Sequence, residues 1–265
     1  GNVVISGDAC HGMIHLPEKI TAIAPYAFAQ NRSITGLSAT KNLTEIGEGA
    51  FWGCSALSEL VLPDDIQQIH AHAFEKCISL KQIDVHAPYV GASAFAFCTE
   101  LKSAYLPLVR TLKSRLFEGC KSLQSVICPK ASEVKEKSFC GCTNLKEFPF
   151  HNIKQIGSYA FDGCDNLREI TFDNNVILSP YAFKDCGRLE KLHIPDTYTS
   201  TSLREYAMSG CTALRLISCG QTYHLKTYKD LFSRQIPEPV RLLFYSALSC
   251  FTIEQETRLC GYQGT

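Results

Sequence analysis

The sequence feature that most constrains the fold is an internal repeat of about 22 residues. The motif A-F-x-x-C-x-x-L recurs along the chain, with some variation at each position. Successive aromatic anchors lie 23, 23, 21, 22, 22, 22, 22 and 25 residues apart. Such self-similarity indicates one structural unit used many times. The nine anchor positions are Phe28, Phe51, Phe74, Phe95, Phe117, Phe139, Phe161, Phe183 and Met208.

Two further apolar patterns complete each repeat. A run of the form L-x-x-I-x-L, as in Leu57–Leu62, ends in alternating apolar and polar side chains, the period of a half-buried β-strand. Proline often follows at once, as at Pro63 and Pro129, and ends the strand because it has no N–H for a further ladder bond. A second apolar pair, as in Ile66–Ile69, then leads to the next anchor.

A unit of 22 residues cannot enclose its own apolar side chains, because each coil has two open faces. Stacking the units covers these faces. We therefore expect about nine coils of 22–23 residues whose equivalent strands pair into a parallel sheet, with Phe above Phe and Cys above Cys.

The strand run with its proline, the I-x-x-I pair and the A-F-x-x-C-x-x-L motif together resemble the BspA-like class of leucine-rich repeats. The match covers about residues 14–219. The resemblance implies an α/β repeat fold, a curved right-handed solenoid with a parallel β-sheet face. It also implies an exported or surface-displayed protein of host-associated bacteria, although some microbial eukaryotes have such proteins, with a role in adhesion and protein binding.

Most of the fourteen cysteines occupy positions that should point inward. Eight lie in the motif's cysteine position, which Asn31 fills in the first copy, and Cys128 and Cys219 replace the last apolar residue of a strand. We interpret these ten as buried free thiols, which are inert and have a high pKa, with occasional disulfides between coils as the alternative. The eight motif cysteines are Cys54, Cys77, Cys98, Cys120, Cys142, Cys164, Cys186 and Cys211.

Four cysteines lie outside these positions. Cys140 forms only a C-x-C pair with Cys142, which is too little for a zinc site. Cys250 and Cys260 could close a small disulfide loop, but we favour unpaired thiols there and at Cys10.

Other candidates for chemistry are weak. His70, His72 and His86 are interpreted as solvated residues on a coil edge rather than metal ligands. The N-x-S/T sequons at Asn31 and Asn42 are treated as incidental, and Asn31 lies in the inward position. The motifs of serine hydrolases, zinc proteases, P-loop proteins and dinucleotide-binding proteins are lacking. We therefore expect no enzymatic activity, no bound metal and no cofactor.

The strand residues between the inward positions should point outward, and stacking places them on one broad face. Val61, Tyr105 and Ile127 are apolar residues flanked by charges, the composition of a moderate protein-binding patch. The predicted partner-binding residues are Glu59, Val61, Gln82, Asp84, Ser103, Tyr105, Ser125, Ile127, Glu147, Glu169, Thr171, Lys191 and His193.

Both ends of a stacked rod expose core and require caps. We predict an N-terminal strand cap or partial repeat over residues 1–19, the solenoid over residues 20–220, and a helical C-terminal cap over residues 221–265. The helix is predicted because apolar residues from Val240 to Phe251 recur at helical spacing after Pro239. The first sixteen residues show no signal-peptide pattern, which does not argue against export.

Together with these observations, the resemblance to BspA-like repeats implies a non-catalytic protein-binding or adhesion module, secreted or on a bacterial cell surface, whose partner is a host extracellular-matrix or cell-surface protein. Lys plus Arg and Asp plus Glu number 26 each, so we expect no general attraction to nucleic acid. Apolar runs are too short for membrane insertion. The alternatives are a structural spacer that displays a neighbouring domain and a thiol-dependent hydrolase, and the oligomeric state is left open.

Overall fold

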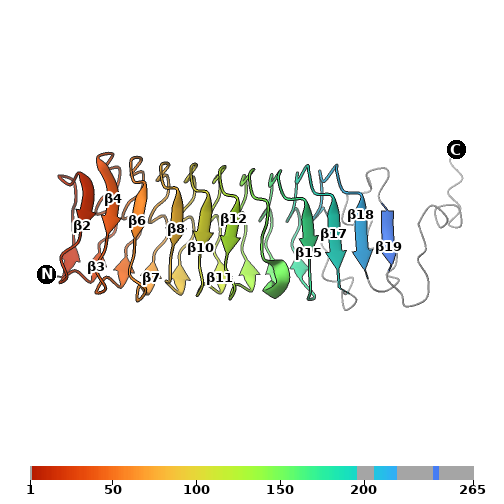
Figure 1. Cartoon of the computed structure of the whole chain (residues 1–265), viewed down its shortest axis with the longest axis horizontal. Coiled ribbons are helices and arrows are strands. Elements are labelled where there is room, and N and C mark those ends of the chain that lie inside the picture. Colours follow the sequence, from red (N-terminus) through yellow and green to blue (C-terminus); the bar gives the residue numbers. More distant parts are fainter. Residues whose placement is uncertain (1, 196–205, 220–240, 245–265) are drawn as a thin grey trace, which may run out of the picture.

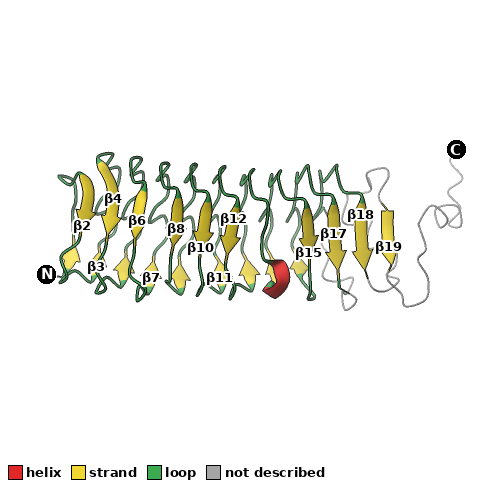
Figure 2. Ribbon diagram, viewed as in Figure 1, coloured by secondary structure: helices red, strands yellow, loops and turns green. Residues whose placement is uncertain are grey.

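A computed structural model describes residues 2–195, 206–219 and 241–244. These residues form a solenoid whose coils stack along one axis, with the first coil and β19 (Arg241–Phe244) at opposite ends (Figure 1). The coils contribute two rows of strands, a longer one and a shorter one, joined by turns (Figure 2). The predicted stack of parallel coils is confirmed.

The longer strands form what we call the strand-lined face. Neighbouring strands pair in parallel within three sheets, in the orders β2-β4-β6, β12-β10-β8 and β15-β17-β18-β19. Side chains alternate between exposed and buried along β8, β12 and β15, as the sequence predicts. The strands of this face are β2 (Gly12–His15), β4 (Ile34–Ser38), β6 (Glu59–Val61), β8 (Gln82–Asp84), β10 (Ser103–Tyr105), β12 (Ser125–Ile127), β15 (Glu169–Thr171), β17 (Lys191–Ile194), β18 (Leu216–Cys219) and β19.

The shorter strands form a second row that the sequence analysis did not predict. It corresponds to the apolar pairs before each anchor, and it pairs in parallel in the orders β1-β3-β5-β7-β9 and β11-β13-β14-β16. The strands are β1 (Val3–Val4), β3 (Ala22–Ile23), β5 (Glu45–Ile46), β7 (Gln68–Ile69), β9 (Tyr89–Val90), β11 (Thr111–Leu112), β13 (Glu133–Val134), β14 (Gln155–Ile156) and β16 (Ile177–Leu178).

The eight anchor phenylalanines form one continuous column in the core. Neighbouring rings stack with centroids 4.8 to 5.9 Å apart and interplanar angles of 3° to 21°. Every ring is at most 1% exposed, and Met208 continues the column with no exposed surface. The column therefore buries the apolar surface that a single coil leaves open.

The motif cysteines form a second column, linked to the first by hydrogen bonds. Each thiol donates to the backbone carbonyl of the anchor one coil earlier, with Sγ···O distances of 3.0 to 3.3 Å. That carbonyl also accepts the N–H of the cysteine in its own coil, as Phe117 does from Cys120 at 3.1 Å. The cysteine is therefore both a small apolar residue and the donor that satisfies a buried carbonyl.

Backbone hydrogen bonds also join the coils at their turns. The N–H of Phe117 donates to the carbonyl of Ser138 at 2.7 Å, and that of Gly119 donates to Cys140 at 2.8 Å. Residues two before and two after the anchor have positive φ, as at Arg115 (59°) and Gly119 (71°). Glycine adopts this conformation without steric cost, which explains why it follows the anchor by two residues in five of the nine repeats.

The first coil is closed by a different residue in the cysteine position. The Asn31 amide donates to the carbonyls of Gly7 and Cys10 at 3.0 and 2.9 Å and accepts the N–H of Ser33 at 2.9 Å. An amide can reach two carbonyls of the irregular N-terminal segment, which a single thiol cannot do. Strands β1 and β2 pair with β3 and β4, so the N-terminal residues add opening strands to both rows.

The predicted C-terminal helical cap is wrong where the structure describes it. Arg241–Phe244 is strand β19, which pairs in parallel with β18 and so continues the strand-lined face. Within residues 2–195, 206–219 and 241–244 the only helical segment is the 3₁₀ helix η1 (Phe150–Asn152). This part is therefore a β-solenoid without α-helices, and the expected α/β class is wrong for it because the segments between the strands are turns. The rest of the predicted cap, including Cys250 and Cys260, lies outside the described residues.

The anchor column predicts that replacing a phenylalanine by alanine lowers the free energy of unfolding more inside the column than in a turn. Phe117→Ala is expected to lower the free energy of unfolding by about 3–5 kcal/mol, because a cavity is left in the column. Phe97→Ala is the matched control, since Phe97 is 39% exposed and belongs to a turn; its cost should be about 1 kcal/mol or less. Urea denaturation measures both, and equal costs would contradict the column as the source of stability.

The cysteine column predicts a loss of stability at high pH. Burial raises the pKa of Cys54, Cys120 and Cys128 from 9.0 to about 12. Burial likewise raises the pKa of five more thiols, those of Cys77, Cys98, Cys142, Cys164 and Cys186. Between pH 9 and 12 the unfolded chain releases protons that the folded chain retains. The contribution of these thiols to the free energy of unfolding is therefore fully present below pH 9. Above pH 9 the free energy of unfolding falls by about 1.4 kcal/mol per pH unit for each thiol.

Urea denaturation between pH 8 and 10 measures this slope. The double variant Cys120→Ser with Cys142→Ser should start from a lower free energy of unfolding but lose it less steeply with pH, by about one proton per molecule at about pH 9, rising toward about two at about pH 10. An unchanged slope in the variant would show that other groups cause the alkaline sensitivity.

Candidate interaction surface

Eleven of the thirteen predicted face residues are exposed, and Ser103 and His193 are half-buried. The strand register sets them in rows that cross the coils. Asp84, Tyr105 and Ile127 are directly aligned in one row, and Gln82, Ser103 and Ser125 are aligned in a second. The predicted outward orientation is therefore confirmed, whereas partner binding remains a prediction.

The first of these rows contains an exposed apolar pair. Tyr105 is 38% exposed and Ile127 is 57% exposed, on adjacent strands β10 and β12. The ring of Tyr105 meets the ring of His86 edge-on at 5.8 Å, and His86 Nε2 lies 3.0 Å from an Asp84 carboxylate oxygen. The pair is thus held by a rigid sheet and bordered by polar groups, as in protein-binding patches.

A basic row, which the sequence analysis missed, lies beside the strands. Its members are the residues that directly follow the leucine of each motif, and this position could have been found from the repeat alignment. The exposed basic members are Lys81, Lys102, Lys146, Arg168 and Arg215.

The strand-lined face is interrupted in the coil that contains residues 145–153. Pro149 occupies the position that Ile127 holds one coil earlier. Because proline has no N–H, it cannot extend the ladder, and only Ser125 and Glu147 pair, as an isolated parallel bridge. The chain then turns into η1. Among the described residues, β15 is consequently an edge strand, paired only with β17.

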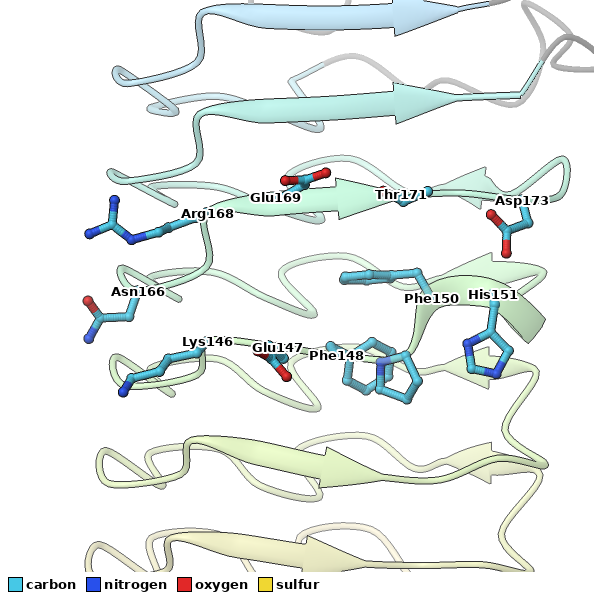
Figure 3. A pocket seen from close by; sticks show the side chains of 11 residues that line it. Lys146, Glu147, Phe148, Phe150, His151, Asn166, Arg168, Glu169, Thr171 and Asp173 are labelled. Carbon is cyan, nitrogen blue, oxygen red and sulfur yellow. The ribbon is translucent and has the colours of Figure 1, made fainter.

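A groove of about 780 Å³ lies at this interruption (Figure 3). Phe148 and Phe150 line it and are 8% and 4% exposed. Both rings also belong to the core, where Phe148 meets Phe139 at 5.2 Å and Phe150 meets Phe172 at 5.5 Å. This packing gives the groove a fixed aromatic floor.

The groove has polar walls of mixed charge. Figure 3 shows Lys146 and Arg168 at one end and His151 and Asp173 at the other. Glu147 and Glu169 lie between them. Arg168 Nη1 is 2.7 Å from a carboxylate oxygen of Glu190, and Glu169 is 3.4 Å from Lys191 Nζ. Of the residues in the groove, the sequence analysis predicted only Glu147, Glu169 and Thr171.

The three histidines considered as metal ligands lie beside carboxylates instead. His70 Nε2 is 2.8 Å from Glu45, His72 Nδ1 is 2.5 Å from Glu75, and His86 contacts Asp84. In the part of the chain that the structure describes, no three His, Cys, Asp or Glu side chains are grouped so as to hold a metal ion.

The cysteines offer no reactive thiolate in the core. The eight motif thiols and Cys128 are free and buried, which confirms the burial predicted for these nine; the side chain of Cys219 lies outside the description. Cys10 and Cys140 are free and half-buried. Burial and the nearby carboxylates of Asp162 and Glu118 raise the pKa of Cys140, which disfavours a nucleophile.

Several comparisons with known proteins agree with this architecture. The chain is similar to a leucine-rich-repeat protein of Treponema pallidum, with 31% identity and a TM-score of 0.56, over 61% of this chain and 79% of that chain. It is also similar to a leucine-rich-repeat protein of Bacteroides ovatus, with 23% identity and a TM-score of 0.57, over 78% of this chain. The match spans 63% of the Bacteroides chain, less than two thirds of its length. None of the curated protein sequences matches significantly.

None of the helices among the described residues has the length and apolar character needed to cross a bilayer.

The sequence profile of the BspA type Leucine rich repeat region, in 6 copies, matches residues 10–124 and 88–215. These ranges cover most of the chain and include all nine anchors and the eight motif cysteines. The chain therefore belongs to the family of BspA-type leucine-rich-repeat proteins.

Proposed function

We propose that the chain is a non-catalytic protein-binding module that engages its partner through the strand-lined face. The observation that carries this proposal is the register that places Tyr105 beside Ile127, both exposed, on a face held rigid by stacked coils. Exposed apolar side chains on a preorganised surface bind with little loss of conformational entropy. The adjoining groove extends this surface by one coil.

The partner that we propose is a host extracellular-matrix or cell-surface protein, and the proposed location is outside a bacterial cell. The resemblance to BspA-like repeats supports both, because that class is typically exported and adhesive. The Treponema protein, at 31% identity, is a bacterial relative with the same kind of repeat.

Binding to an array of purified extracellular-matrix and cell-surface proteins tests this proposal. The double variant Tyr105→Ala with Ile127→Ala should weaken binding to the captured partner about tenfold or more, because it removes two central apolar contacts. Tyr89→Ala with Ile177→Ala is the matched control, since these residues are 43% and 48% exposed on the other row of strands. No binding to any protein of the array would instead favour a structural spacer, and equal binding by the wild type and both variants would show that the partner does not use Tyr105 and Ile127.

A further inference from the structure

In the groove, side chains of opposite charge flank an apolar floor. We call Lys146 and Arg168 its basic end and Asp173 its acidic end (Figure 3). All three side chains are exposed. Arg168 uses one of its five N–H donors on Glu190, and the others remain available to a ligand.

The two ends are separated by a fixed length of extended chain. Arg168 and Asp173 flank β15, and five residues of extended chain span about 16 Å. Because β15 is paired with β17 and anchored by the buried Ile170 and Phe172, the separation of the two ends is set by the fold.

The middle of the groove selects against acidic groups. Its floor is formed by Phe148, Pro149 and Phe150, and its walls carry Glu147 and Glu169. Lys191 compensates Glu169, whereas Glu147 has no ion-pair partner among the described residues. An acidic ligand group is therefore attracted at the basic end and repelled elsewhere, which fixes the orientation of a ligand.

We infer that the groove binds an extended peptide segment of the partner protein, with an acidic residue at the basic end, an apolar side chain over the aromatic floor and a basic residue at the acidic end. This inference rests on the proposed function and specifies the chemistry of its partner. A volume of about 780 Å³ suits a few side chains rather than a folded domain. A polyanion fits less well, because it would lie against Glu147, Glu169 and Asp173 as well as the basic end.

Short synthetic peptides test this inference. The probe is Gly-Asp-Ser-Leu-Ser-Ser-Lys-Gly, in which the acidic and basic residues are five apart to match Arg168 and Asp173. Three related peptides replace Lys by Asp, Asp by Lys, or Leu by Ser. Affinities are measured by NMR titration at low salt, where interactions between exposed charges are least screened. The wild-type protein should bind the probe at least about fivefold more tightly than each related peptide.

Charge reversal in the protein should reverse this preference. The Lys146→Glu, Arg168→Glu variant has two acidic ends and should prefer the peptide in which Lys replaces Asp to the probe. The Asp173→Lys variant has two basic ends and should prefer the peptide in which Asp replaces Lys. Lys102→Glu is the matched control, because Lys102 lies in the same basic row two coils before the groove; it should bind like the wild type. Circular dichroism checks that every variant is folded.

Equal affinity of the wild type for all four peptides, or preferences that reversal leaves unchanged, would overturn the inference. The proposed function is tested separately by the captured partner protein. If that partner still binds the Lys146→Glu, Arg168→Glu variant but not the Tyr105→Ala, Ile127→Ala variant, the part of the strand-lined face around Tyr105 and Ile127 is the binding site and the groove is not.

Discussion

The structure depends on the contact between one coil and the next. No coil can enclose its phenylalanine alone, because the following coil supplies the stacked ring. The carbonyl of that residue accepts one N–H within its own coil and gains its second donor, a cysteine thiol, only from the following coil. The same contact aligns the turns and both rows of strands, because their backbone groups bond between coils at a common spacing. The outward side chains are aligned in the same way, so the arrangement of the strand-lined face is a consequence of the core.

Much of the fold could be predicted because its signals repeat. The anchor period gave the number of coils, and the position of the cysteines within the motif indicated that they point inward. The C-terminal helix failed for a physical reason: the apolar run from Val240 to Phe244 suits a strand as well as a helix, and the unpaired edge of β18 provides a ladder for it. The apolar pairs of the second row were recognised but not assigned to strands, because a strand of two residues is too short to show the alternation of side chains.

The candidate site was predictable only where it is regular. Alternation along the strands correctly placed Tyr105 and Ile127 on the surface, because the period of a strand fixes which side chains face outward. The groove depends on one coil that departs from the repeat. In the sequence, this departure is visible only as Pro149, which lies inside the strand run instead of after it. The packing of Phe148 and Phe150 beneath the groove depends on three-dimensional contacts that the repeat pattern does not encode.

The hydrogen-bonded thiols have a consequence for redox chemistry. Cysteine content ordinarily reflects the compartment in which a protein works, because exposed thiols oxidise outside the cell. Thiol oxidation and disulfide exchange begin from the thiolate, and a thiol with a pKa of about 12, such as that of Cys120, forms almost none at neutral pH. Once neighbouring coils have closed over it, such a sulfur should react only slowly with glutathione and oxidants. The vulnerable period is folding itself, before each sulfur is enclosed.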